Sequence, residues 1–202
     1  MGTLARPQRR PRHDPKQTER EIVDAAEKLL RERPFREFTV DEVMRRTELK
    51  RPAFYVHFRD RHDLALRVFE DIASELSDKT DLWLTSDDPA VGLRAALEGL
   101  ARVYLDHGVV LRGFSDAAGS DERVEAAYNG VVQGFIDATA QRIREQQAMG
   151  QVPADLDPDE TGRALIWLNE RYFTEALGRD PQTDTAKVVD MLERIWMSTL
   201  YA

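Results

Sequence analysis

Apolar residues recur along this chain at the three- and four-residue spacing of an α-helix, and this periodicity restricts the possible fold more than any other feature. The first stripe consists of Ile22, Ala25, Ala26, Leu29 and Leu30, with charged residues on the opposite face. Similar stripes continue to the last residues, and no segment shows a sustained two-residue alternation of strand-forming side chains. The sequence therefore predicts an all-α fold.

Local signals place the ends of these helices. Pro34 ends the first helix, and Thr39 with Glu42 three residues later is a capping box that starts the second. Pro52 fits the first turn of a third helix, whereas "HGVVLRGF", residues 107–114, is expected to break a later one. The expected helices are 16–33, 40–47, one from Pro52 to about 57, about 61–78, one from Pro89 to the break, 122–147, 159–178 and 184–201.

Charge is distributed unevenly along the chain. Residues 1–62 have a net charge of +5 and the remainder has −13, which together give the total of −8. The basic N-terminal part can approach a polyanion, whereas the acidic remainder would repel it. The two parts of a chain also differ in charge by chance. Residues 1–15 contain three prolines and four arginines and little to bury, so we expect a disordered basic arm.

Composition excludes several classes of protein. The chain has no cysteine, which excludes disulfides and thiolate chemistry and is compatible with a reducing cytoplasm. No uncharged apolar run approaches the about 18 residues of a membrane span. The fragment "GFSDA", residues 113–117, lacks the second glycine and the preceding strand of a serine nucleophile motif. His57 and His62 lack the helical spacing of a metal pair. We therefore expect no catalytic residue, no metal, no cofactor and a cytoplasmic location.

Two short helices within residues 40–57 match a helix-turn-helix, which places the start of its second helix against DNA bases. Phe54 and Phe58 lie four residues apart and can face a core together. Lys50 and Arg51 stand at the start of this helix, where they can face DNA, and arginine or lysine can pair with guanine. This arrangement explains why one short segment is both aromatic and cationic.

The stretch "TVDEVMRRTELKRPAFYVHFRDRHDL", residues 39–64, resembles the TetR family of transcriptional regulators. The resemblance is close over residues 18–75 and departs in the turn, where Glu48 replaces a usual glycine, and at the helix start. It implies phosphate contacts from Thr39, Lys50, Tyr55 and Arg61. It implies that Arg51, Pro52, Ala53 and His57 lie nearest the bases or the adjoining backbone, although His57 is equally compatible with a helix-end residue that contacts no base. Arg6, Arg9, Arg10 and Arg12 either enter a minor groove or form a plain solubilising tail.

The segments "ALIWLNERYF" and "ERIWMSTLYA" resemble the EthR branch of that family, in which an aromatic tunnel binds ligand. The resemblance implies a lining of Leu93, Leu100, Phe114, Tyr128, Val132, Phe135, Ile166, Asn169, Phe173 and Trp196. Leu93, Leu100 and Ile166 replace more polar or aromatic family residues, which favours a hydrophobic or lipid-like ligand. Asn169 is the expected polar contact. From the residues alone, a core asparagine bonded to backbone is the better explanation.

These patterns together predict a ligand-responsive regulator, most simply a repressor that a small hydrophobic effector releases from double-stranded operator DNA. The expected parts are the arm at 1–15, a helix-turn-helix DNA-binding domain at 16–62 and a regulatory domain at 63–202. A homodimer would form through the last two helices, whose stripes include Leu165, Leu168 and Tyr172, then Val188, Val189, Leu192, Ile195 and Leu200. The stripes can equally pack the protomer's own core. The alternative function is a helical protein-interaction module without sequence-specific DNA binding.

Overall fold

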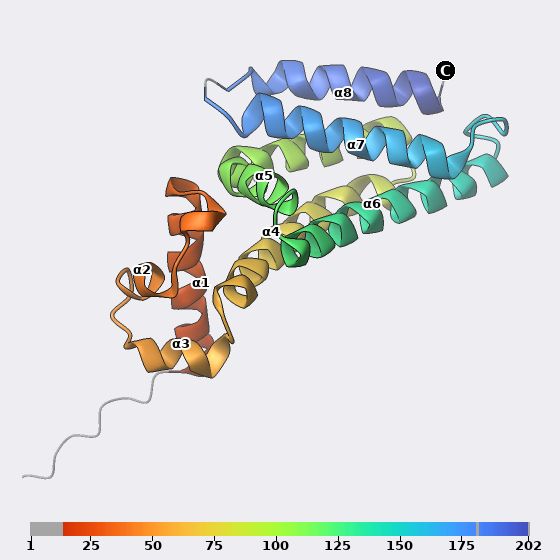
Figure 1. Ribbon diagram of the computed structural model, residues 1–202. Helices are drawn as coiled ribbons and strands as arrows, with labels where there is room; N and C mark the ends of the chain where they lie inside the picture. Colours follow the sequence, from red (N-terminus) through yellow and green to blue (C-terminus); the bar gives the residue numbers. More distant parts are fainter. Residues whose placement is uncertain (1–13, 181, 202) are drawn as a thin grey trace, which may run out of the picture.

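The computed structural model describes residues 14–180 and 182–201, and in this part the chain forms eight α-helices, one 3₁₀ turn and no strand (Figure 1). The all-α prediction is therefore confirmed. The elements are α1 Pro15–Glu32, η1 Phe35–Glu37, α2 Val40–Met44, α3 Arg51–His57, α4 Arg61–Leu84, α5 Pro89–Ala118, α6 Glu122–Ala148, α7 Pro158–Leu177 and α8 Thr185–Leu200. None of these helices is both long and apolar enough to cross a membrane.

Residues 14–60, which we call the head, pack α1 against α2 and α3. Helices α1 and α2 begin at a side-chain cap, whereas α3 begins after Lys50 without one. The Asp14 carboxylate accepts from the backbone N–H of Lys16, and the Thr39 hydroxyl accepts from the N–H of Glu42 at 3.3 Å. The Glu42 carboxylate in turn accepts from the Thr39 hydroxyl at 2.9 Å, so Thr39 is held on both sides.

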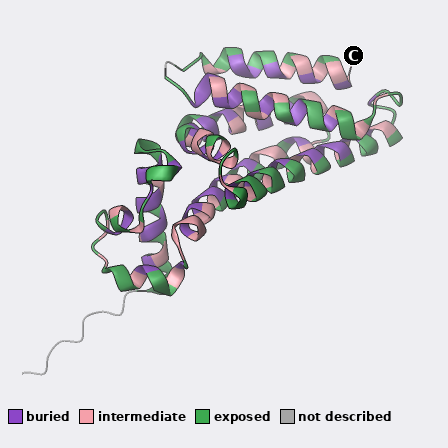
Figure 2. Cartoon of the chain, viewed as in Figure 1, coloured by how far each residue is buried: buried purple, intermediate pink, exposed green. Residues whose placement is uncertain are grey.

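Residues 61–201, which we call the body, form a bundle of helices beside the head (Figure 1). Helix α4 leads from the head into this bundle, packing on α1 at one end and on α5 and α6 further along. Helices α7 and α8 lie side by side, and both also pack on α5. Buried residues follow the inward faces of these helices, and exposed residues follow the outward faces (Figure 2). The bundle thus extends the helical stripes of the sequence into one continuous core with the head.

Four expected boundaries were wrong. Helix α2 ends at Met44, three residues before its expected end at residue 47. The "HGVVLRGF" segment does not break its helix, because α5 continues through it to Ala118. Helix α4 extends to Leu84, beyond the expected end near residue 78. The last two residues of the expected arm belong to α1, where Asp14 is the cap and Pro15 is the first helical residue. Residues 1–13, which include the four arginines of that arm, lie outside the described residues.

The apolar stripes assigned to a dimer interface mostly pack the protomer itself. Their buried members are Leu165, Val188, Val189, Leu192 and Leu200. Leu168, Tyr172 and Ile195 are only partly buried and remain at the surface of α7 and α8. The alternative that these stripes serve the protomer's own core is therefore correct for most of them.

Candidate nucleic-acid interface and ligand cavity

Helix α3 separates its two faces as the aromatic and cationic segment predicts. Phe54 is fully buried, its ring lies 5.6 Å from that of Phe58, and both belong to the core. On the other face Lys50, Arg51 and Tyr55 are exposed, with 54% of Tyr55 accessible. The buried aromatic pair fixes the rotation of α3 about its axis, so the cationic face is turned to solvent.

Arg51 is held in position by two neighbours on the exposed surface. Its guanidinium lies 2.8 Å from the Asp41 carboxylate of α2 and donates to the Tyr55 hydroxyl at 3.2 Å. The hydrogen bond with Tyr55, followed by the charge of Asp41, raises the pKa of Arg51. The side chain is therefore a fixed cation at the start of α3, suited to pairing with a base edge or a phosphate.

Three other expected DNA contacts have partners within the protein. The ring of His57 is mostly covered and lies 4.0 Å from Glu19 of α1. Arg61 donates to the backbone carbonyls of Phe38 at 3.0 Å and Arg36 at 3.3 Å, so it ties α4 to the head. Thr39 caps α2 as described above. Pro52 is exposed and Ala53 is half-buried at the start of α3.

Sequence reasoning missed two residues of this surface. Val56 is 76% exposed, and an exposed valine on a helix that lies in the major groove of DNA can contact a thymine methyl group. Asp41, the ion-pair partner of Arg51, comes from the preceding helix. The exposure of Val56 follows from its place between Phe54 and Phe58, and the helical period could have revealed it. The Asp41 contact depends on how α2 and α3 cross.

A cavity lies inside the body, where α4, α5, α6 and α7 meet. Its volume is about 70 Å³, below the roughly 300–1,000 Å³ of typical ligand pockets, so a drug-sized ligand fits only if side chains move apart. Seven expected residues line it, namely Leu100, Tyr128, Val132, Phe135, Ile166, Asn169 and Phe173. The lining residues that were not expected are Phe69, Leu76, Thr80, Tyr104, Leu111, Val131 and Glu170.

Three expected lining residues lie elsewhere in the core. Leu93 is buried on α5 but does not reach the cavity. Phe114 packs against Phe69, with ring centroids 4.8 Å apart, and lines a separate cleft between α5 and the head. Trp196 lies behind the cavity wall, with its ring edge-on to Trp83. Helix α5 lines the cavity with other residues, but Leu93 and Phe114 point elsewhere, and α8, which carries Trp196, contributes no lining residue.

Asn169 is buried and accepts a hydrogen bond from the Trp196 indole N–H at 2.9 Å. Its side-chain oxygen is therefore bonded to another side chain, not to backbone. We expect Asn169→Leu to lower the free energy of unfolding by about 1–3 kcal/mol, because the indole N–H then stays buried without a partner. Adding Trp196→Phe should restore part of that loss in urea unfolding. Strictly additive losses in the double variant would show that this hydrogen bond contributes nothing.

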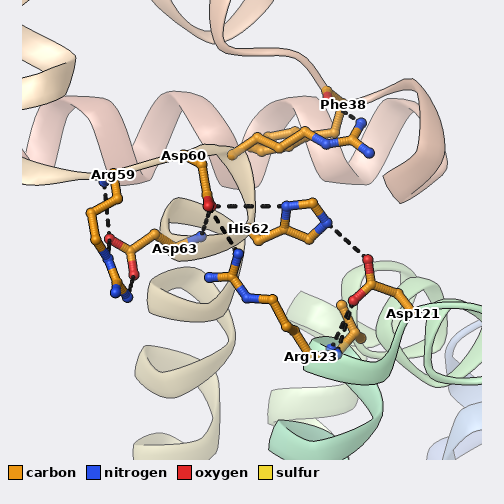
Figure 3. A network of polar contacts seen from close by, with 9 residues as sticks. Phe38, Arg59, Asp60, His62, Asp63, Asp121 and Arg123 are labelled. Atoms are coloured by element: carbon orange, nitrogen blue, oxygen red, sulfur yellow. Dashed lines mark hydrogen bonds and ion pairs between the residues drawn. The ribbon is translucent and has the colours of Figure 1, made fainter.

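A polar cluster joins the start of α4 to the start of α6 beside the head (Figure 3). His62 lies 2.8 Å from the Asp121 carboxylate, and Arg123 donates to Asp60 at 2.9 Å. Asp60 is also the cap of α4, accepting from the N–H of Asp63 at 2.9 Å. We call Asp60, His62, Asp121 and Arg123 the junction. It makes the N-terminal ends of α4 and α6 one unit, and both helices line the cavity further along.

A second contact between head and body pairs Glu27 of α1 with His107 of α5 at 2.7 Å. Glu75 of α4 lies 3.6 Å from the other ring nitrogen, and Arg31 of α1 lies 3.3 Å from the first. The hydrogen bond to His107, against the cost of burial, lowers the pKa of Glu27 to about 2. The hydrogen bond to Glu27 raises the pKa of His107 above its usual 6.5.

These shifts predict a pH dependence of stability. The raised pKa of His107 stabilises the fold fully below pH 6.5, and this contribution disappears as the pH rises through the folded-state value. The lowered pKa of Glu27 stabilises the folded state above pH 4.5, and this contribution is lost as the pH falls towards 2. In thermal unfolding experiments, the free energy of unfolding should decline by about 1 kcal/mol or less between about pH 5.5 and 8.5, because the cost of burying the charged ring offsets part of the hydrogen bond to Glu27. His107→Gln and Glu27→Gln should both flatten this slope, and a slope that persists in both variants would contradict the assignment.

The fragment "GFSDA" lies within the continuous helix α5, without the strand-to-helix turn that a nucleophilic serine requires. This part of the described chain therefore lacks the geometry of that motif.

Comparison with known proteins gives two family matches. Residues 22–68 match the model described as bacterial regulatory proteins, tetR family, and residues 93–202 match the model described as transcriptional regulator EthR, C-terminal domain. The first covers most of the head and the start of α4. The second covers the remaining cavity helices and α8, more than half of the chain.

Individual relatives agree with these matches. The HTH-type transcriptional regulator EthR of Mycobacterium tuberculosis is 25% identical over 215 aligned residues, covering 100% of this chain and 95% of the relative. The regulator of the same name from Mycolicibacterium smegmatis is 26% identical, covering 89% and 84%. Among solved structures, a putative TetR-family regulator from Rhodococcus sp. superposes with a TM-score of 0.77 at 18% identity, covering 91% of this chain and 98% of that one.

Proposed function

Because the chain belongs to the TetR family of bacterial regulatory proteins, with a C-terminal domain of the EthR type, we propose that it is a repressor released from its operator by a small hydrophobic ligand. The family and its relatives are DNA-binding transcriptional regulators, not enzymes. Beyond the family's general function, the proposal specifies that the protein represses transcription, that its ligand is hydrophobic and that it acts in the cytoplasm. It also assigns the head to DNA and the body to ligand and partner.

The DNA surface that we propose is the exposed face of α3 with the start of α2. It consists of Thr39, Lys50, Arg51, Pro52, Ala53 and Tyr55, with Val56 added from the structure. His57 and Arg61 remain proposed contacts, but both side chains also have partners inside the protein. Lys50 and Arg51 supply the charge that draws the head to phosphate, and Arg51 is placed for base reading.

The observation that carries the proposed release is the course of α4 and α6. Both helices line the cavity, through Phe69 and Leu76 on α4 and Tyr128 on α6. The N-terminal ends of both helices lie at the junction beside the head. A ligand that widens the cavity therefore moves α4 and α6, the two helices whose N-terminal ends contact the head. It lowers operator affinity only as far as it prefers the conformation that binds DNA less well.

We propose that two protomers associate through the outer surface of α7 and α8. Apolar side chains remain there, with Trp167 40% and Met191 48% exposed, beside the partly buried Leu168, Tyr172 and Ile195. TetR regulators act as dimers, and a two-fold dimer would present two copies of α3 to successive turns of DNA.

Fluorescence anisotropy with the DNA that flanks the protein's own gene tests the proposal, with a scrambled duplex and a salt series alongside. We expect tight binding to one duplex that weakens steeply with salt. A reporter gene behind that operator should be less active when the protein is present, which separates repression from activation. If unbiased site selection yields no preferred sequence, the operator assignment fails.

A further inference from the structure

The lining of the cavity is mostly apolar, with a few polar side chains and one acidic side chain. Of its lining side chains only Glu170 is ionisable to an anion at neutral pH, and none is basic. Glu170 is followed on α7 by Arg171, but that guanidinium pairs with Glu175 at 3.0 Å. Among residues 14–180 and 182–201, no cationic side chain is ion-paired with Glu170, and its carboxylate accepts a hydrogen bond from the Thr174 hydroxyl at 3.1 Å.

The Tyr128 hydroxyl lies near this carboxylate. Tyr128 is buried, with 8% of its surface exposed, and lines the cavity; its phenolic oxygen stands beside the Glu170 carboxylate and the Ser115 hydroxyl but forms no hydrogen bond of good geometry with either. Burial, reinforced by the neighbouring Glu170, raises the pKa of Tyr128, so the hydroxyl keeps its proton. A buried hydroxyl that is poorly hydrogen-bonded costs free energy, part of which a ligand head group would recover.

Asn169 contributes an amide to the same wall. Because its oxygen already accepts from Trp196, the group it has left to offer is the amide N–H₂. The lining thus includes one carboxyl group without a cationic partner, beside neutral groups. A carboxylate ligand brought beside Glu170 would place two acidic groups together in a mostly apolar site, whereas an ammonium would offer Glu170 an opposite charge.

We propose that this cavity selects hydrophobic ligands with a protonated amine, and that Glu170 anchors the amine while Tyr128 hydrogen-bonds the head group. This inference rests on the proposed ligand site in the body and narrows the class of ligand from hydrophobic to hydrophobic and cationic. Phe69, Leu100, Val132 and Phe173 would surround the alkyl or aryl part.

Isothermal titration of the full-length protein with octylammonium, octanol and octanoate tests the charge preference. The three probes share one chain, so the cost of widening the cavity is the same for all, and the head group alone differs. We expect octylammonium to bind roughly 10- to 100-fold more tightly than octanoate, as for a hydrogen bond to a charged group in a buried site. Glu170→Gln should abolish this preference by weakening octylammonium and improving octanoate.

Glu175→Gln is the matched control, because this residue lies one turn later on α7, outside the cavity lining, and pairs with Arg171 and Arg179. It should leave the preference unchanged. Tyr128→Phe keeps the ring and should weaken octylammonium and octanol together. If octanoate or octanol binds wild type as tightly as octylammonium, the charge selectivity is wrong while the ligand site stands. If none of the three probes binds, the ligand site and this inference fail together.

Discussion

Arg51→Ala is expected to weaken binding to the operator roughly 10- to 100-fold and to bring it close to binding of a scrambled duplex. Arg51 stands at the start of α3, exposed, and Asp41 and Tyr55 hold its guanidinium. A bidentate contact with one base pair contributes to specific binding alone, so loss of the side chain affects the operator more than other DNA. Anisotropy titrations with both duplexes measure this ratio directly.

The matched control is Arg36→Ala. Arg36 is also an exposed arginine of the head, with 83% of its side chain accessible, but it belongs to η1, which packs against α5. Its removal changes the net charge by the same amount and should leave the ratio of operator to scrambled affinity unchanged. If Arg51→Ala weakens both duplexes equally, then Arg51 contacts phosphate and another side chain reads the bases.

The head was predictable from sequence to a large extent because its signals are local. Thr39 and Glu42 mark the start of α2 through a cap, and Phe54 with Phe58 sets the rotation of α3 through the helical period. Each signal needs only residues within four positions of one another. The partners of Arg61 were not predictable, because the carbonyls that it binds come from residues more than twenty positions earlier.

The cavity was predictable only in part. Its residues come from four helices, and the helical period places a side chain on a face but does not say which inward-facing residues border a space. Tyr104 and Glu170 were missed for this reason, whereas Trp196 was expected at the cavity and instead lies behind its wall. Seven of the ten residues implied by the resemblance to the EthR branch line this cavity. Individual side chains depended on how α4, α5, α6 and α7 pack.

The expected break in α5 shows how a glycine can be misread. Gly108 and Gly113 suggested a helix end, but α5 is continuous and the two glycines differ in their surroundings. A Cβ atom built on Gly108 would lie 2.7 Å from the Cα atom of Gly178, the residue that caps α7. Gly108 is therefore where α5 and the end of α7 approach backbone to backbone, and it does not mark an interruption.

Gly108→Ala should consequently lower the free energy of unfolding by about 1–3 kcal/mol, since backbone atoms on both sides cannot yield as a flexible side chain would. Gly113→Ala, five residues further along the same helix, should raise it by roughly 0.5–1 kcal/mol. No heavy atom outside the helix lies within 4 Å of a Cβ built there. Urea unfolding followed by circular dichroism measures both variants against wild type.

The opposite signs make this pair decisive about the packing of α5 on α7. Alanine is a better helix former than glycine at either position, so helix propensity alone predicts stabilisation in both variants. Only a close approach at Gly108 reverses the sign at one of them. If both substitutions stabilise the protein, the backbones of α5 and α7 do not approach each other closely at Gly108 and Gly178. If both destabilise it, α5 has a genuine discontinuity at its glycines, and the interrupted helix expected from the sequence is correct after all.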